Sequence, residues 1–183
     1  VRPGAAEDEV EEQEEREARL KGEPRDGGLG GLLLIERPIA QPFLKDYDAP
    51  PCEPPKSWSK QFDVSRWLVL AARLDGVRVG GAVVAFGSVG VDMLEGRRDL
   101  AVLWDIRVSD GVRGRGVGHA LFRAAADWAR AQGCSSLKVE TQNINVAACR
   151  FYARQGCQLG AISRFAYHEL PSEVQLLWYL NLR

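Results

Sequence analysis

One stretch limits what this chain can fold into more than any other, residues 101–118, AVLWDIRVSDGVRGRGVG. The run Leu100–Val108 is mostly apolar and β-favouring, and Ser109–Gly111 is typical of a turn. A glycine-rich segment, Arg113–Gly118, follows it. Apolar residues then recur at a helical period, at Val117, Leu121, Ala124, Ala125 and Trp128. The stretch predicts a strand, a glycine-rich turn and a helix over Val117–Ala131.

The glycine-rich turn is a candidate anion site. The first N–H groups of a helix lack internal partners, and the helix dipole favours negative charge there. Glycines let a ligand approach the backbone, and Arg113 and Arg115 add positive charge. We expect a phosphate or pyrophosphate, with solvated arginines as the alternative. A P-loop is excluded because no G-K-[ST] follows, and a dinucleotide fingerprint would need glycine where His119 or Leu121 stands.

Length and composition favour a globular protein of ordinary character. The 183 residues are 45% hydrophobic and 27% charged, with a net charge of −1, so nothing indicates a nucleic-acid partner. No apolar run approaches the ~20 residues of a membrane span, and the acidic start is unlike a signal peptide. We therefore expect a cytoplasmic protein without a membrane partner. The four cysteines form no C-x-x-C pair, so we expect free thiols and no metal site.

The N-terminal residues 1–31 are predicted to precede a single main domain, residues 32–183. Glu7–Lys21 is rich in helix formers, with acidic residues first and basic residues last. This order suits the helix dipole and predicts a mostly solvated helix, with a functional acidic patch as the alternative. Gly22–Gly31 is predicted to be a glycine-rich connector.

The next segment is dominated by prolines. Leu32–Glu36 fits either a short strand or an apolar arm. Pro38–Lys60 contains six prolines, so we expect an extended loop without regular structure. This loop carries three aromatic residues, Phe43, Tyr47 and Trp58.

The remaining elements indicate a mixed α/β chain. Trp67–Leu74 and Val77–Phe86 are β runs joined by Asp75-Gly76, a strong hairpin signal. Gly80-Gly81 suggests a bulge or the close approach of another backbone. Later elements are expected as a strand, a helix and two strands, at Leu137–Thr141, Val146–Gln155, Gln158–Tyr167 and Val174–Leu182. The last strand could serve as the edge of a homodimer.

Two motifs resemble the GCN5-related N-acetyltransferase (GNAT) superfamily. Arg113, Gly116 and Gly118 stand as R-x-x-G-x-G directly after a strand, which resembles the superfamily's acetyl-CoA pyrophosphate motif. Asn145–Gly156 resembles its second cofactor motif, N-x-x-A-x-x-x-Y-x-x-x-G. The two motifs occur in the order and on the elements that the superfamily has.

A closer resemblance is to the streptothricin acetyltransferases within this superfamily, through Glu140–Cys149 and Glu173–Leu180. It implies an α/β fold with a mixed, twisted central sheet, flanking helices and an opened strand edge for the cofactor. It also implies an acyltransferase that moves acetyl from acetyl-CoA directly to a primary amine. A cationic small molecule such as a streptothricin-like antibiotic would make this an antibiotic-resistance enzyme. The alternatives are a protein N-terminal or lysine acetyltransferase and a non-catalytic acyl-CoA-binding sensor.

The resemblance implies that acetyl-CoA contacts mainly the backbone. The pantetheine arm would run along Ile106–Val108, and the pyrophosphate would lie on Arg113–Gly118. Asn145 would contact the pantetheine, which is compatible with a helix-capping role, whereas His119 could touch phosphate or only cap or be solvated. The expected cofactor residues are Ile106, Arg107, Val108, Arg113, Gly114, Arg115, Gly116, Val117, Gly118, His119, Asn145, Ala148 and Tyr152.

Three side chains are candidates for the chemistry. Tyr152 is the candidate general acid for the CoA sulfur, and the alternative is a buried tyrosine whose hydroxyl has found a partner. Asp105 and Glu140 each lie in an apolar strand, where an unpaired carboxylate is costly. Partial burial would raise the pKa of either and make it a candidate base for the amine. The alternative is a structural pairing with a cation such as Arg107 or Lys138.

Three further features bear on the acceptor. Trp104 stands where a second acidic residue is expected in the streptothricin enzymes, so the acceptor stays open. The resemblance implies that the proline-rich loop forms one wall of the acceptor pocket, although its aromatic residues could simply pin it to the surface. Cys149 is expected to be a small packed residue and not a nucleophile.

Overall fold

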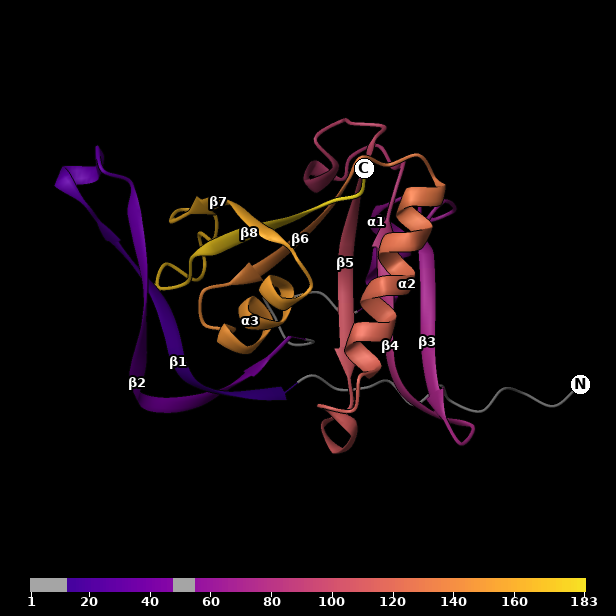
Figure 1. The fold of residues 1–183 in the computed structure, drawn as a ribbon, viewed down its shortest axis with the longest axis horizontal. Coiled ribbons are helices and arrows are strands. Elements are labelled where there is room, and N and C mark those ends of the chain that lie inside the picture. Colours follow the sequence, from indigo (N-terminus) through magenta and orange to yellow (C-terminus); the bar gives the residue numbers. More distant parts are fainter. Residues whose placement is uncertain (1–12, 48–54) are drawn as a thin grey trace, which may run out of the picture.

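The computed structural model describes residues 13–47 and 55–183, and Figure 1 shows a sheet with its helices beside a separate β-hairpin. The sheet has the order β3-β4-β5-β6-β8-β7. Its strands are β3 (Leu68–Leu74), β4 (Val77–Ala85), β5 (Leu100–Val108), β6 (Ser136–Gln142), β7 (Gln158–Ser163) and β8 (Gln175–Asn181). Neighbouring strands are antiparallel except for the pair β5–β6. The expected mixed α/β fold is confirmed.

Three α-helices accompany the strands in the described residues, α1 (Pro55–Gln61), α2 (Val117–Ala131) and α3 (Val146–Arg154). The predicted bounds of α2 are confirmed, because its apolar period sets one face against β3, β4 and β5 (Figure 1). That face buries Leu121, Phe122, Ala125, Ala126 and Ala129. Within this part of the chain, no helix is both long and apolar enough to cross a membrane.

Strands β5 and β6 pair only over their first halves. Leu100–Leu103 pairs with Ser136–Val139, and neither strand pairs with the other beyond that point. Strand β5 continues beside β4, and β6 continues beside β8, so the two strands part (Figure 1). The expected opened strand edge is therefore present.

A β-bulge lies where β5 leaves β6. Val84 pairs with Leu103 and Val83 pairs with Asp105, so Trp104 is an extra residue on β5. A regular strand would place Trp104 and Asp105 on opposite faces. The extra residue instead lets both side chains line the same small pocket.

The glycine pair Gly80-Gly81 allows the neighbouring strands to approach β4 closely. A Cβ added at Gly80 would lie 2.6 Å from the Arg107 carbonyl oxygen, and one at Gly81 would lie 2.9 Å from the Leu70 carbonyl oxygen. Such distances are too short for any side chain, so the predicted close backbone approach is confirmed.

The hairpin consists of β1 (Gln13–Pro24) and β2 (Leu32–Asp46). The expected helix over Glu7–Lys21 is wrong for residues 13–21, and residues 7–12 lie outside the described part. The helix propensity of this segment does not decide its structure, because the backbone of β1 pairs with β2 in an antiparallel ladder. The predicted connector Gly22–Gly31 is the end of β1 and the hairpin turn, and the division of the chain at residue 31 stays a prediction.

The expectation that no regular structure crosses Pro38–Lys60 is also wrong. Strand β2 runs through Pro38 and Pro42, and α1 begins at Pro55. Prolines are tolerated in β2 because both strands of the hairpin are edge strands. The pairing is also interrupted between Pro38 and Phe43, where residues 39–42 have no partner on β1. Proline is also favoured in the first turn of a helix.

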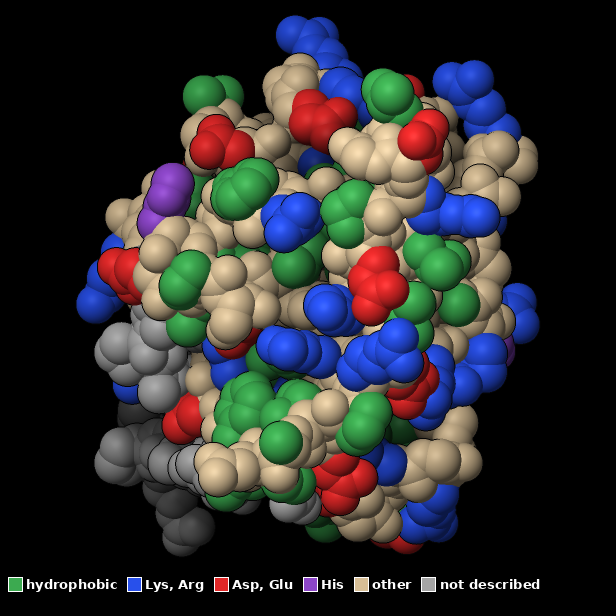
Figure 2. All heavy atoms as spheres, turned by 90° about the vertical axis from the view of Figure 1, so that its left-hand side faces the viewer, with side chains coloured by type: hydrophobic (Ala, Val, Ile, Leu, Met, Phe, Trp, Pro, Cys, Tyr) green, Lys and Arg blue, Asp and Glu red, His purple; other side chains and the backbone are tan. Residues whose placement is uncertain are grey.

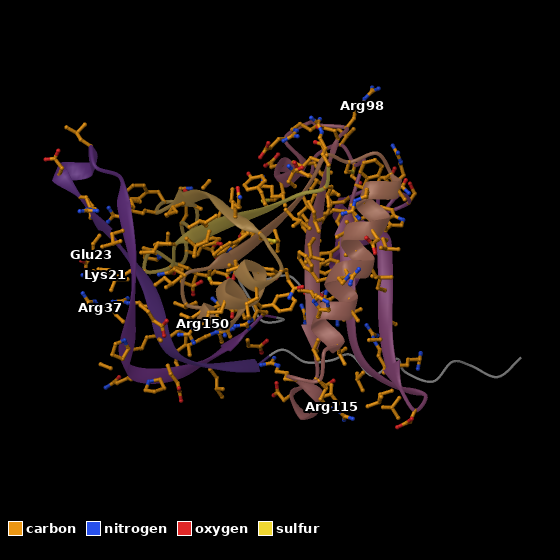
Figure 3. The ribbon with its side chains drawn as sticks, viewed as in Figure 1. Lys21, Glu23, Arg37, Arg98, Arg115 and Arg150 are labelled. Carbon is orange, nitrogen blue, oxygen red and sulfur yellow. The ribbon has the colours of Figure 1, made fainter. Side chains whose placement is uncertain are left out.

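The hairpin stands beside the sheet (Figure 1), and two sets of contacts fasten it to the rest of the chain. Leu20 exchanges two hydrogen bonds with Asn143, at 2.8 and 3.0 Å. Lys45 forms a buried ion pair with Glu173. Figure 2 shows Lys and Arg side chains gathered across the middle of the face that carries the hairpin, where Figure 3 labels Lys21, Arg37 and Arg150.

Strand β8 lies between β6 and β7. The expectation that it offers a dimer edge is therefore wrong, because both of its sides are already paired. The edges of the six-stranded sheet are β3 and β7. Strand β7 also ends earlier than expected, at Ser163 instead of Tyr167.

Candidate active site

A pocket of about 650 Å³ opens where β5 and β6 part. Its walls come from the end of β5, the turn before α2, the end of β6 and the helix α3. Both candidate carboxylates, Asp105 and Glu140, line it together with Tyr152. The opened sheet thus brings together the three side chains that the sequence proposed for the chemistry.

The glycine turn forms one end of this pocket. Gly116 is the N-cap of α2 with a φ of 86°, in the left-handed region that favours glycine. The first helical bond runs from the Ala120 N–H to the Gly116 carbonyl, so the N–H groups of the first turn have no partner within the helix. Gly114, Gly118 and His119 also line the pocket.

Arg113 and Arg115 lie differently around the turn. The Arg113 guanidinium donates from Nε to the Val108 carbonyl at 3.2 Å and forms an ion pair with Asp110 at 3.0 Å. Arg113 lines the pocket, whereas Arg115 is exposed at the outer end of the turn (Figure 3). Of the expected cofactor residues, Arg107, Arg115 and Val117 do not line this pocket.

Helix α3 supplies the opposite wall with Asn145, Ala148 and Tyr152. The Asn145 side chain caps the helix, because its Oδ1 accepts from the Ala148 N–H at 3.0 Å. Tyr152 is buried and packs against the rings of Phe122 and Phe151. His119 is exposed, and its Nδ1 lies 2.7 Å from Gln155 Oε1.

The two carboxylates have different partners. The Arg107 Nε lies 3.0 Å from each oxygen of Asp105, so the cationic pairing foreseen as an alternative exists for Asp105. Glu140 instead accepts from the Tyr167 hydroxyl at 2.6 Å and from Gln175 Nε2 at 2.6 Å. Glu140 has no ion-pair partner among residues 13–47 and 55–183. Lys138, the other cation considered, forms an ion pair with Glu95, in which Lys138 Nζ lies 2.7 Å from Glu95 Oε1.

Tyr167 was not identified from the sequence. Burial, together with the negative charge of Glu140, raises the pKa of the Tyr167 hydroxyl above its usual value. The hydroxyl therefore keeps its proton and donates to Glu140. No local pattern marks Tyr167 or Gln175, because both reach Glu140 from distant parts of the chain.

A second pocket of about 370 Å³ adjoins the first, and Tyr47, Trp104 and Asp105 line both. The second pocket is also lined by Trp58, Gln61, Phe62 and Arg107. Two residues of the proline-rich segment, Tyr47 and Trp58, thus lie beside the candidate site. The expectation that this segment forms a wall of the acceptor pocket stays a prediction.

Cys149 is buried with 3% of its surface exposed. Burial raises the pKa of its thiol to about 12, so the thiolate is scarce at neutral pH. This agrees with a packing role. In the described part of the chain, no group of three or more His, Cys, Asp or Glu side chains could hold a metal ion.

Comparisons with known proteins point to one family. Residues 37–157, more than half of the chain, match the sequence model of the acetyltransferase (GNAT) family. Streptothricin acetyltransferase A of Bacillus subtilis (strain 168) is 38% identical over 81 residues, which are 43% of this chain and 47% of that protein. Streptothricin acetyltransferase of Escherichia coli is 40% identical over 84 residues, which are 44% of this chain and 48% of that protein. The chain matches about half the length of these relatives.

Among solved structures, the fold of this chain is similar to that of a candidate streptothricin acetyltransferase from Bacillus anthracis str. Ames, whose structure was solved in complex with acetyl coenzyme A. The TM-score is 0.74 at 24% identity, and the match covers 94% of this chain and 90% of that chain. This likeness supports the same arrangement of strands and helices.

Proposed function

This chain belongs to the acetyltransferase (GNAT) family, and on that premise we propose that it transfers the acetyl group of acetyl-CoA to a primary amine. In this reaction the amine nitrogen bonds to the acetyl carbon and the carbon–sulfur bond breaks. One proton leaves the amine, and one proton reaches the departing sulfur. The products are an N-acetyl amide and free CoA.

The observation that carries this proposal is the pocket between β5 and β6. It combines a strand edge that has no β-sheet partner among the described residues, a glycine-capped helix N-terminus, two carboxylates and a buried tyrosine. The strand edge offers backbone groups to an extended pantetheine, and the helix start offers N–H groups to phosphate. A Cβ added at Gly116 would meet no atom of the described residues within 4 Å, which leaves space beside the helix start for a ligand.

Within the proposed reaction, Glu140 is the better candidate base. The oxygens of Asp105 already accept from the Arg107 guanidinium, so this carboxylate is engaged by a cation. The neutral donors Tyr167 and Gln175 hold Glu140 in place without a cationic partner in the described residues. Tyr152, in the same pocket, is the candidate donor of a proton to the sulfur.

For the acceptor, we propose a small cationic amine, and the names of the two relatives suggest a streptothricin-like antibiotic. Acetylation would then confer resistance in the cytoplasm. The alternative acceptors are a protein N-terminus and a lysine side chain, and the alternative to catalysis is a sensor that binds acyl-CoA without turnover. Separately, we propose a homodimer as the assembled form.

Thermal stability measured with acetyl-CoA, and with ATP and NAD as controls, tests the cofactor. A ligand at one hundred times its Kd should stabilise the folded protein by about 2.7 kcal/mol. We expect acetyl-CoA, but neither ATP nor NAD, to raise the melting temperature. Addition of streptothricin should then release CoA thiol. A shift without CoA release from any amine would support the sensor instead. A folded protein that shows no shift would overturn the assignment.

Two glycines at opposite ends of α2 give a matched test of the pyrophosphate site. Gly116 and Gly133 have φ values of 86° and 81°, and a Cβ at either would meet no protein atom within 4 Å. Alanine at either position should therefore cost a similar free energy of unfolding, about 1–2 kcal/mol. Only Gly116→Ala should weaken acetyl-CoA binding, by about tenfold, because its methyl group lies at the pocket. Calorimetry on both variants measures this, and equal affinities would contradict the placement.

A further inference from the structure

The walls of the second pocket point to the chemical class of the acceptor. We propose that the acceptor is an arylalkylamine, a primary amine joined by a short chain to a planar aromatic ring. Its ring would lie against Trp58, Phe62 and Trp104, with its amino group directed to Glu140 in the adjoining pocket. This inference rests on the proposed acetyl transfer, and it names an acceptor class that competes with the streptothricin-like amine suggested by the names of the relatives.

Four aromatic rings form one cluster at this pocket, which we call the aromatic wall: Trp58, Phe62, Trp67 and Trp104. Trp104 lies 5.3 Å from Trp67, 5.5 Å from Phe62 and 6.2 Å from Trp58, measured between ring centroids. These separations are typical of favourable aromatic pairs. The wall therefore has a defined geometry before any ligand arrives.

The aromatic wall is fixed from behind. Trp67 donates from Nε1 to Ser88 Oγ at 2.6 Å. Three of the rings, Phe62, Trp67 and Trp104, pack on a buried apolar cluster that consists of Ala85, Val91, Leu94 and Val102. Trp58, Phe62 and Trp104 nevertheless keep part of their surface exposed and line the second pocket. Large rings held rigidly and left half-covered beside a hollow are typical of a binding surface for a flat apolar group.

The bulge on β5 connects the aromatic wall to the site of reaction. Trp104 is the extra residue, and it lines both pockets together with Asp105. A ring on the wall and an amine near Glu140 would therefore belong to one continuous ligand. The two pockets share Tyr47, Trp104 and Asp105 in their walls, so we choose a short alkyl chain to join the ring to the amine.

Charge in the second pocket does not favour a polycation. Asp105 and Arg107 are the charged residues in the described lining, and they form an ion pair with each other at 3.0 Å. Their side chains are only 19% and 11% exposed, respectively. In the described lining, a ligand body meets aromatic rings and this ion pair. Trp104, at a position where an acidic residue was expected, adds an aromatic face there, which favours planar bodies.

The test compares three amines on the wild-type protein with saturating acetyl-CoA: 2-phenylethylamine, 2-cyclohexylethylamine and 1,4-diaminobutane. The first two have the same chain and similar bulk but differ in aromaticity. We expect kcat/KM for 2-phenylethylamine to exceed that for 1,4-diaminobutane by tenfold or more, with the cyclohexyl compound in between. CoA release at equal or higher kcat/KM with the diamine would overturn the inference and leave the acetyltransferase assignment standing.

Substitutions in the aromatic wall test whether these rings bind 2-phenylethylamine. Trp104→Leu and Phe62→Leu should each raise KM for 2-phenylethylamine about tenfold and change kcat little, because ring contact is made equally before and during reaction. Trp128→Leu is the matched control, since Trp128 packs on Phe86 outside both pockets. Phe62→Leu keeps the test valid if Trp104→Leu does not fold. Unchanged KM in a folded Trp104→Leu or Phe62→Leu variant would overturn the inference.

If no amine causes release of CoA, the binding of 2-phenylethylamine still tests the proposed substrate class. Calorimetry with 2-phenylethylamine and the wild-type protein should then show binding that Phe62→Leu weakens and Trp128→Leu does not. Absence of such binding would overturn the substrate class. Absence of turnover with acetyl-CoA binding intact would instead overturn the proposed catalysis.

Discussion

Replacing Glu140 by glutamine should lower kcat for acetyl transfer by about 10²- to 10⁴-fold, with KM for acetyl-CoA nearly unchanged. Glutamine has the shape of glutamate, and its carbonyl oxygen can still accept a hydrogen bond from Tyr167. Its amide cannot take up the proton that the amine must lose. The measurement is the initial rate of CoA thiol release across a range of acetyl-CoA concentrations.

Asp105→Asn is the control for this effect. Asp105 lines the same pocket, but its oxygens already accept from Arg107, so the loss in kcat should be much smaller. A kcat for Glu140→Gln within threefold of the wild-type value would remove Glu140 from the reaction. A larger loss for Asp105→Asn than for Glu140→Gln would transfer the base role to Asp105.

Replacing Lys45 by methionine should lower the free energy of unfolding by about 3–5 kcal/mol. The Lys45 ammonium lies 2.7 Å from Glu173 Oε1, and the two side chains are only 10% and 7% exposed. The other carboxylate oxygen, Glu173 Oε2, is buried and has no hydrogen-bond partner among the described residues. Removal of Lys45 would therefore leave a buried, uncompensated negative charge. Urea unfolding followed by circular dichroism measures the loss.

Two variants control this prediction. Lys21→Met removes a lysine from the same hairpin whose contact with Glu23 is 3.8 Å long and largely exposed, and it should cost less than about 1 kcal/mol. The double variant Lys45→Met with Glu173→Leu removes both charges and should recover much of the stability. Equal losses for Lys45→Met and Lys21→Met would show that the buried pair contributes little.

The parts of the fold that were predictable from the sequence are those with local causes. Strand β5 and helix α2 have the expected bounds because the apolar pattern within each segment decides them. The helix expected through residues 13–21 is a strand because its partner lies on β2, which the local propensities of β1 do not reveal. The burial of β8 within the sheet likewise depends on β7 folding back beside it.

The candidate site divides in the same way. The glycine turn, Asn145 and Tyr152 were expected because each belongs to a motif contiguous in sequence. Tyr167 and the aromatic wall were missed because they depend on distant segments meeting at the pocket. The sequence also offered no sign of the bulge at Trp104, since a bulge on β5 is defined only by its register with β4.

The fastening of the hairpin has a consequence for the order in which the chain can fold during synthesis. Lys45 meets Glu173 across 128 positions, and Leu20 meets Asn143 across 123. The first-made strands must therefore wait until almost the last strand has left the ribosome before they can dock. Sheet pairs such as β3–β4, whose partners are close in sequence, have no such delay. Tyr47, two residues after Lys45, lines both pockets and would reach them only in that final step, so the nascent chain would complete the pocket walls last.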